Sequence, residues 1–216
     1  MAYGVLKAPK NLVINLQPSP KQYELWKLLQ PDYCPHSGGP IEQVLIGYDA
    51  KGNAQYKPQC NKCQSQDLPQ LILGGGAAGG GKSYLGSCWI ISSGIRFENI
   101  RAVVARKTIK SLKESTFNTI KTILKTWGLK EGINYKINNL EGTVTFWNDS
   151  VILLKEMVDL PSDPNFERLG SSEYTIAFVD EVSEISERAI EVLFSRLRWR
   201  THETFKTPRM FMSTNP

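Results

Sequence analysis

The chain has 216 residues, of which 41% are hydrophobic and 10% aromatic, so it can bury a sizeable core and is not a disordered tail. Its four cysteines are too few for a disulfide scaffold, and residues 1–10 lack the pattern of a secretory leader, so we expect a reducing cytosolic compartment. No apolar run approaches the roughly 20 residues of a membrane-spanning helix, and a net charge of +5 permits a polyanionic partner without requiring one.

The N-terminal part of the sequence predicts a short helix over residues 20–29. Ser19 is a suitable N-cap, because its side chain can accept a hydrogen bond from a backbone N–H of the first turn. Pro20 fits the first turn, where no N–H is needed, and Pro31 stands just beyond the end of the helix.

Residues 33–68 differ in kind from the rest of the sequence. They are polar and rich in turn residues, carry three of the four cysteines, and predict a hairpin of strands over 44–48 and 54–56. We interpret them as an inserted module. The chain then divides into an N-terminal segment (1–32), the cysteine-bearing insertion (33–68) and a core domain (69–216).

Beyond the insertion, short apolar runs alternate with helical patterns. Strands are expected over residues 71–73, 102–105, 143–147, 151–154, 175–179 and 210–212, and helices over 82–95, 109–127 and 187–197. This alternation predicts an α/β fold with a mainly parallel central sheet flanked by helices.

A glycine-rich loop follows the first of these strands. Residues 76–83 fit G-x-x-x-x-G-K-[ST], the phosphate loop of P-loop NTPases, in which backbone N–H groups surround phosphate oxygens. Lys82 would reach the β and γ phosphates of ATP, and the hydroxyl of Ser83 would hold Mg²⁺. The alternative, a flexible linker, needs neither the strand before the loop nor the helix after it. The loop glycines are Gly76, Gly79, Gly80 and Gly81.

The strand expected over residues 175–179 is followed by two carboxylates, which is the form of a Walker B element. Asp180 would bind Mg²⁺, and Glu181 would orient or deprotonate the attacking water. Taken alone, the pattern also fits an ordinary strand leaving the core. A glutamate directly after the aspartate resembles the additional-strand, catalytic-glutamate branch of P-loop ATPases, and residues 102–105 are available as the strand between the phosphate-loop and Walker B strands.

Several stretches occur in an order and spacing that are typical of one family. They are residues 18–22 (Pro-Ser-Pro-Lys-Gln), the phosphate loop, the hairpin over 143–152, Asp180-Glu181, residues 190–198 and residues 213–216 (Ser-Thr-Asn-Pro). Together they resemble the large terminase subunit of tailed double-stranded DNA phages, the ATPase of the genome-packaging motor. The resemblance implies that Gln22 contacts the adenine and that Thr214 and Asn215 couple the state of the γ-phosphate to movement. Without the other stretches, the tail would be interpreted as an ordinary turn before a proline.

The same resemblance implies ATP and Mg²⁺ as cofactors and double-stranded DNA, the capsid portal and a small terminase subunit as partners. It also implies a homo-oligomeric ring in the active state, in the host cytoplasm during virion assembly. Family members usually carry a nuclease domain after the ATPase, but no carboxylate cluster for two metals follows the coupling element here, so nuclease activity is not assigned to these residues. Two alternatives stay open: another P-loop nucleic-acid motor, such as a helicase or repair ATPase, and a zinc-dependent nucleic-acid-binding module with a nucleotide switch.

The cysteine-bearing insertion has the layout of a zinc ribbon. Cys60 and Cys63 form a C-x-x-C pair, and Cys34-Pro35-His36-Ser37-Gly38 resembles a zinc knuckle in which Ser37 replaces the second cysteine. We expect a Zn²⁺ site of Cys34, His36, Cys60 and Cys63. So polar a segment has too little apolar content to fold without a stabilising metal ion. Three reduced cysteines and a surface histidine are the alternative. Cys88 is expected to be a small buried apolar residue.

Positive charge is concentrated in residues 96–130, which hold nine Lys or Arg residues against two Glu. On a single helix over residues 109–127, four lysines would share one face: Lys110, Lys113, Lys121 and Lys125. Such a face is either simply solvated or positioned against DNA phosphates.

ATP hydrolysis in motors of this kind usually needs an arginine at the γ-phosphate, often from a neighbouring subunit. Arg168 stands 12 residues before Asp180, at a position where some terminases carry such a trans-acting arginine. A surface salt bridge is the alternative role. The next candidates are Arg196, Arg198 and Arg200.

Overall fold

The computed structural model describes most of the chain. The residues outside the description are 1–5, 11, 13, 15, 31, 32, 67, 77, 78, 201–207 and 216. They include Pro31, Ala77, Ala78 and Pro216 of the predicted motifs.

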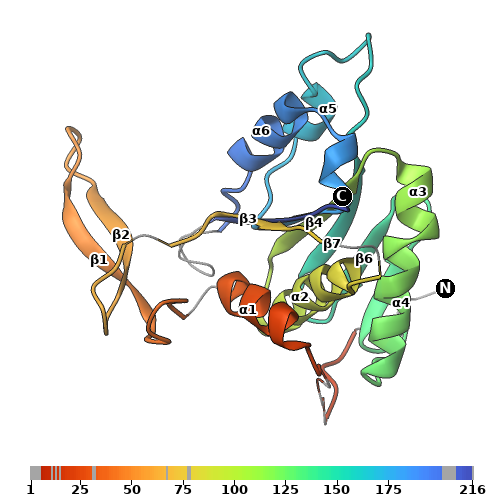
Figure 1. Ribbon diagram of the computed structural model, residues 1–216, viewed down its shortest axis with the longest axis horizontal. Coiled ribbons are helices and arrows are strands. Elements are labelled where there is room, and N and C mark those ends of the chain that lie inside the picture. Colours follow the sequence, from red (N-terminus) through yellow and green to blue (C-terminus); the bar gives the residue numbers. More distant parts are fainter. Residues whose placement is uncertain are drawn as a thin grey trace.

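A seven-stranded, mostly parallel sheet forms the centre of the core domain, as predicted (Figure 1). In spatial order its strands are β3 (Leu71–Gly74), β9 (Arg209–Ser213), β8 (Ile176–Val179), β4 (Arg101–Arg106), β7 (Val151–Glu156), β6 (Thr143–Phe146) and β5 (Tyr135–Asn138). The first five are parallel to one another, and β6 and β5 continue the sheet as an antiparallel hairpin extension of β7.

One expectation about strand order is wrong. The strand between β3 and β8 is β9, and β4, which contains residues 102–105, lies on the far side of β8, between β8 and β7. Apolar composition could not distinguish the two strands, because both are buried on both faces. The order matters for the site: β9 brings residues that are remote in sequence between the predicted phosphate loop and the predicted Walker B carboxylates.

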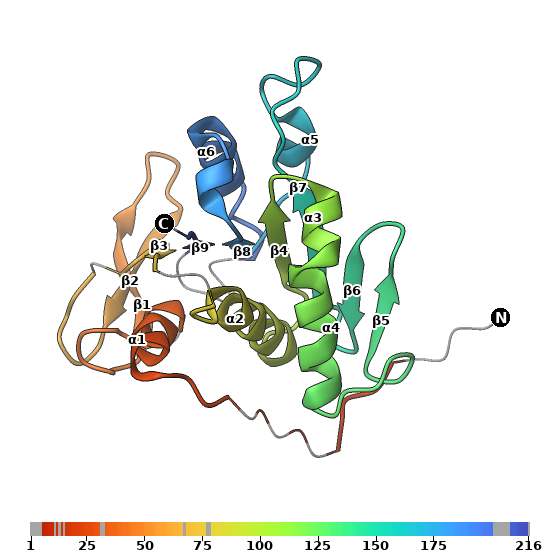
Figure 2. The ribbon, with the colours of Figure 1, turned by 45° about the vertical axis from the view of Figure 1, so that its right-hand side comes forward.

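Helices cover both faces of the sheet. One face is covered by α1 (Pro20–Leu29), α2 (Lys82–Arg96) and α4 (Thr116–Thr126), and the other by α5 (Glu167–Gly170) and α6 (Glu187–Ser195) (Figures 1 and 2). Alternate strand residues therefore enter two separate cores: Val104 and Phe178 pack on the α2 side, and Val103 and Val179 on the α6 side. Among the described helices, none is long and apolar enough to cross a bilayer.

The N-terminal helix is fastened to the core domain at its carboxyl end. The Arg209 guanidinium, fully buried at the start of β9, donates to the carbonyls of Leu28 and Gln30, and the Trp89 indole N–H donates to the Leu29 carbonyl over 3.0 Å. Cationic and N–H donors at this end satisfy carbonyls that have no partner within the helix. At the other end of α1, Gln22 Nε2 donates to the Gly80 carbonyl over 3.1 Å, so the first turn lies beside the predicted phosphate loop.

The helix expected over residues 109–127 is two helices, so the single-helix expectation is wrong. Helix α3 (Ile109–Glu114) ends and α4 begins at Ser115, whose backbone has φ −112° and ψ −86°. The Ser115 hydroxyl donates to the Ser111 carbonyl and accepts from Arg106 Nη1, both over 2.7 Å, so it competes with the regular helical bonds. The four lysines of the predicted basic face are accordingly divided between α3 and α4.

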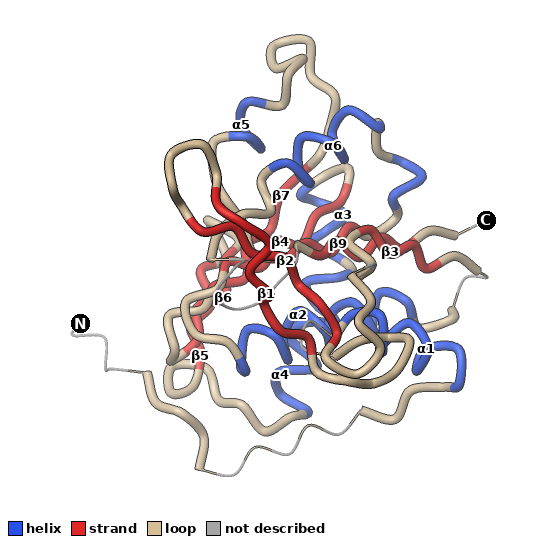
Figure 3. Tube along the Cα trace, turned by 90° about the vertical axis from the view of Figure 1, so that its left-hand side faces the viewer, coloured by secondary structure: helices blue, strands red, loops and turns tan. Residues whose placement is uncertain are grey.

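The insertion forms a hairpin that projects from the core domain (Figure 1), and in Figure 3 its two strands face the viewer. Strands β1 (Ile41–Tyr48) and β2 (Ala54–Cys60) pair antiparallel, with an irregularity between Leu45 and Gly47. They form a two-stranded sheet of their own, so the insertion adds to the fold without extending the central sheet.

Candidate functional site

The carboxyl ends of three neighbouring strands meet at one edge of the sheet. β3 leads into the predicted phosphate loop, β8 into Asp180 and Glu181, and β9 into Thr214 and Asn215. The Thr214 N–H donates to the Gly74 carbonyl over 3.2 Å, which joins the end of β9 to the start of the loop. In a parallel sheet this edge is the usual place for a ligand.

The predicted phosphate loop has the backbone that its glycines permit. Gly81 is the N-cap of α2 with φ +69°, and Gly76 has φ +129°, a conformation that other residues rarely adopt. A Cβ on Gly76 or Gly79 would meet nothing within 4 Å, so the loop surface there borders open space. Lys82 begins α2, and its ammonium donates to the Gly76 carbonyl over 2.8 Å. A helix N-terminus, a cationic side chain and open backbone together suit a polyphosphate.

A cavity of about 430 Å³ lies between the start of α1 and this loop. It is lined by Gln22 and Leu25 of α1 and by Gly76, Gly79 and Lys82 of the loop region, among others. Its position places one apolar and one amide side chain of α1 opposite the phosphate loop.

Gln22 is committed to contacts within the chain. Its amide oxygen accepts from the Ser19 N–H over 2.8 Å and completes a capping box, and its Nε2 donates to the Gly80 carbonyl over 3.1 Å. Nε2 also occupies the space that a Cβ on Gly81 would need. The structure thus places Gln22 against the phosphate loop, and the adenine contact stays a prediction.

Asp180 is the centre of a buried cluster of hydroxyl groups. Only 2% of the residue is exposed, and its carboxylate accepts from Ser83 Oγ over 2.8 Å, Ser213 Oγ over 2.6 Å and Thr116 Oγ1 over 2.6 Å. The contact with Ser83 joins the two residues predicted to hold Mg²⁺. Sequence reasoning missed the roles of Thr116 and Ser213. Ser213 directly precedes Thr214, which is a usable signal, whereas Thr116 lay inside an expected continuous helix.

Glu181 has an unusual backbone. Its φ of +55° and ψ of +56° lie in the left-handed region, which is uncommon for a non-glycine residue and costs free energy. Its carboxylate accepts from Asn215 Nδ2 over 2.6 Å. The conformation turns the chain directly after β8, so adjacent carboxylates have different partners: hydroxyls for Asp180 and an amide for Glu181.

Arg168 is paired within its own chain. Its Nε donates to Asp163 over 2.9 Å and its Nη1 to Glu156 over 3.3 Å, while about half of the side chain, 51%, stays exposed. The hydrogen bond from Arg168 lowers the pKa of the Asp163 carboxyl below its usual value. Arg168 does not line the cavity at the phosphate loop.

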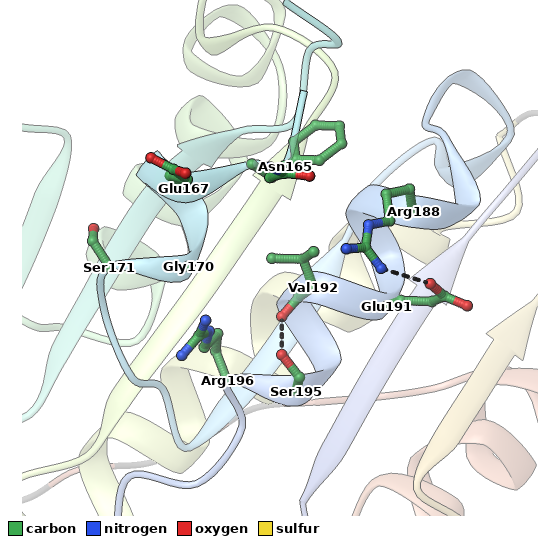
Figure 4. Close-up of a pocket in the computed structure, with 10 residues that line it drawn as sticks. Asn165, Glu167, Gly170, Ser171, Arg188, Glu191, Val192, Ser195 and Arg196 are labelled. Carbon is green, nitrogen blue, oxygen red and sulfur yellow. Dashed lines mark hydrogen bonds and ion pairs between the residues drawn. The ribbon is translucent and has the colours of Figure 1, made fainter. Parts of the chain in front are cut away.

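The other predicted arginines, Arg196, Arg198 and Arg200, do not line the phosphate loop cavity either. Arg196 lines a separate cavity of about 580 Å³ between α5 and α6, where its guanidinium lies against Gly170 (Figure 4). On the same cavity wall, Arg188 and Glu191 form an exposed ion pair at 3.6 Å. Arg198 pairs with Glu173 at 2.7 Å, and Arg200 lies at the edge of the described residues with φ +48°.

In the insertion, three of the four predicted zinc ligands come together. The sulfur atoms of Cys34, Cys60 and Cys63 all lie within 4.8 Å of one another, and none of these thiols is in a disulfide. His36 is not part of this group. The Ser37 hydroxyl instead contacts Cys60 Sγ at 3.2 Å. Cys88, in α2, is fully buried in the core on the α2 side of the sheet, as expected for a small apolar residue.

Comparison with known proteins gives one family and one fold. The family model described as phage terminase large subunit matches residues 70–216. The large terminase of a thermophilic bacteriophage is similar in structure, with a TM-score of 0.56 and 18% identity over 72% of this chain and 36% of that chain. For the complex of the same terminase with ADP, the TM-score is 0.53 and the identity 19%, over 68% of this chain and 34% of that chain. For the large terminase of bacteriophage HK97, the TM-score is 0.52 and the identity 12%, over 67% of this chain and 29% of that chain.

The chain spans about a third of the length of these solved terminases. At identities this low, the likeness establishes the fold. No curated protein sequence matches the chain.

Proposed function

Because the chain belongs to the phage terminase large subunit family, we propose that it carries the ATP-hydrolysing site of a motor that packages double-stranded DNA into a procapsid. The observation that carries the proposal is the convergence of Lys82, Ser83, Asp180 and Glu181 at one edge of the sheet, with Asn215 on Glu181. The family membership does not favour the alternative of a helicase or a repair ATPase.

The residues present fit ATP and Mg²⁺. The phosphate loop borders open space, Lys82 and the N-terminus of α2 supply positive charge, and the cavity extends from the loop to Gln22 and Leu25. Ser83 and Asp180 are the residues that would hold Mg²⁺, and bound Mg²⁺ supplies positive charge at the phosphates. The terminase of the thermophilic bacteriophage, which is similar in fold, has been solved with ADP and with ATP-γ-S, which supports a nucleotide at this site.

Glu181 is the proposed general base. Its carboxylate follows directly after the Mg²⁺-binding position, and it accepts from Asn215 and not from the hydroxyls that surround Asp180. A carboxylate in this place can accept the proton of the attacking water and orient its oxygen toward the γ-phosphate. Lys82 would hold the negative charge of the β and γ phosphates.

The segment after β9 is the proposed coupling element. Thr214 is hydrogen-bonded to the end of β3 and Asn215 to Glu181, so both are sensitive to the position of the loop and of the base. If nucleotide binding broke the hydrogen bond between Asn215 and Glu181, the segment after β9 would be free to move. Buried Arg209, at the start of β9, would pass that movement on to α1.

The remaining parts of the proposal come from the family. The partners are double-stranded DNA, the capsid portal and a small terminase subunit, and the site of assembly is the host cytoplasm. A ring of copies is required if Arg168 completes the site of a neighbour. Exposed on the surface and held by two carboxylates, Arg168 has the accessibility that such a role needs.

The proposal is tested by ATP turnover of the purified chain and two variants. Lys82→Ala should abolish turnover, because the charge on the phosphates is lost. Glu181→Gln should keep ATP binding but lower single-turnover hydrolysis by on the order of 10²-fold or more, as expected for a lost general base. Glu184→Gln, on the exposed turn that follows, is the matched control and should hydrolyse ATP at the parental rate. Parental hydrolysis by Glu181→Gln would show that the base is another group.

A further inference from the structure

We propose that the insertion is a zinc-binding module in which the thiolates of Cys34, Cys60 and Cys63 hold one Zn²⁺ and the fourth corner lies at the Ser37 hydroxyl. The inference concerns a part of the chain outside the proposed ATPase site and does not depend on it. It also changes the predicted ligand set, because Ser37 replaces His36 as the fourth ligand.

The two cysteine-bearing turns have the same backbone. In the first turn, Gly38 N–H donates to the Cys34 carbonyl over 2.9 Å, and Cys34 N–H donates to the Gly39 carbonyl over 2.8 Å. In the second, Gln64 N–H donates to the Cys60 carbonyl over 3.0 Å, and Cys60 N–H donates to the Ser65 carbonyl over 2.9 Å. Residues 34–39 and 60–65 therefore form two turns of matching geometry, the two knuckles, which face each other.

The match extends to the backbone angles and to the packing between the knuckles. The fifth residue of each turn is left-handed, with φ +66° at Gly38 and +61° at Gln64. Gly39 permits the close approach, because a Cβ there would lie 2.5 Å from Lys62 Cβ and 3.0 Å from Cys60 Sγ. Residues other than glycine seldom have a left-handed backbone, so the positive φ of Gln64 indicates that this turn geometry is required.

The sulfur positions suit a tetrahedral metal ion. Cys34 Sγ and Cys63 Sγ lie 3.6 Å apart, and thiolates that share one tetrahedral zinc lie about 3.8 Å apart, since each Zn–S bond is about 2.3 Å long. The N–H groups of Lys62 and Cys63 point at Cys60 Sγ over 3.4 and 3.5 Å, which stabilises negative charge on that sulfur. Thiolate ligands in tetrahedral geometry favour zinc over the harder divalent cations.

The correspondence of the two knuckles identifies the fourth corner. Ser37 is the fourth residue of its turn, as Cys63 is of the other, and its hydroxyl lies 3.2 Å from Cys60 Sγ. A neutral hydroxyl is a weaker zinc ligand than a thiolate, so this corner would be held by Ser37 or by a water next to it. The module also needs the metal for stability, because its described buried core consists of only four side chains: Cys34, Ile41, Cys60 and Leu68.

Elemental analysis of the full chain, purified under reducing conditions and dialysed, tests the site. We expect one zinc per chain in the parent and in Cys88→Ala, the matched control that removes the one cysteine outside the cluster. The double variant Cys60→Ser with Cys63→Ser should contain none. A zinc content below about 0.2 per chain in the parent, or unchanged zinc in the double variant, would overturn the proposal. So would a disulfide between Cys34 and Cys63 that persists under reductant.

A gain of affinity tests the fourth corner. Ser37→Cys completes a four-thiolate site and should lower the Kd for zinc, measured by competition with a chromophoric chelator, by more than about tenfold, whereas His36→Ala should leave it unchanged. Co²⁺ in place of zinc should show thiolate charge-transfer absorption that rises by roughly one third in Ser37→Cys, as three sulfur ligands become four. Weaker binding in His36→Ala with no gain in Ser37→Cys would assign the corner to the histidine. Neither readout depends on ATP turnover, so each proposal can fail separately.

Discussion

Asn215 Nδ2 donates to Glu181 Oε1 over 2.6 Å, so the second residue after β9 is bonded to the second carboxylate after β8. The two side chains are 34 positions apart in sequence and meet because β9 and β8 are parallel neighbours. The contact joins the proposed base to the proposed coupling element by a single hydrogen bond.

Asn215→Asp should lower ATP turnover by more than Asn215→Ala does. The aspartate removes the amide donor and also places a second negative charge beside Glu181, whereas the alanine only removes the donor. The measurement is kcat of the two variants and the parent under the same conditions. Parental turnover in Asn215→Asp would separate Asn215 from the base.

Thr116→Val should destabilise the fold by about 1–3 kcal/mol, because it leaves a buried oxygen of Asp180 without its donor at nearly constant side-chain volume. Thr122→Val, at an exposed position of the same helix, should stay within about 0.5 kcal/mol of the parent. Urea midpoints of the three proteins make the comparison. Equal midpoints for both variants would show that the Thr116 hydroxyl is not needed for stability.

Arg168 should act on the site of a neighbouring copy. Arg168→Ala chains keep an intact phosphate loop, and Lys82→Ala chains keep Arg168. Alone, Arg168→Ala should lose turnover by on the order of 10³-fold and Lys82→Ala should have none, while a mixture recovers part of it. Asp163 is buried, but its carboxylate also accepts from the backbone N–H groups of Glu167 and Arg168, so it keeps partners in Arg168→Ala and this variant should remain folded.

The control for this experiment is Arg188→Ala, which removes another exposed, ion-paired arginine and should keep parental turnover. In the parent, specific activity should rise with protein concentration as copies associate. If associated chains show no complementation, the next arginines to test are Arg196, Arg198 and Arg200.

Cys88 should be inert to thiol reagents in the native chain. Burial raises the pKa of its thiol to about 12, so at about pH 8 almost no thiolate is present to react. Mass spectrometry after alkylation should find Cys88 unmodified before denaturation and modified after it. Exposed Cys63, in protein freed of metal by a chelator, is the positive control. Rapid native modification of Cys88 would mean that α2 opens readily.

Local patterns were enough to predict most of the elements. Ser19 and Pro20 mark the start of α1, and the glycine loop before Lys82 marks the start of α2, because capping and left-handed turns depend on residues that are adjacent in sequence. The phosphate loop and Asp180-Glu181 were recognisable for the same reason. The C-x-x-C pair likewise indicated a metal-binding turn.

The sequence by itself could not give the contacts that depend on strand order and on helix breaks. The position of β9 between β3 and β8 brings Ser213 and Asn215 to the two carboxylates, and composition cannot distinguish one fully buried strand from another. At the helix break, the Ser115 hydroxyl accepts from Arg106 of β4 and the neighbouring Thr116 hydroxyl donates to Asp180, and both are contacts between residues remote in sequence. The contact of Ser37 with the sulfur cluster is a further example: both His36 and Ser37 follow Cys34 closely, and only the tertiary structure shows that the Ser37 hydroxyl lies 3.2 Å from Cys60 Sγ, whereas His36 is not in the cluster.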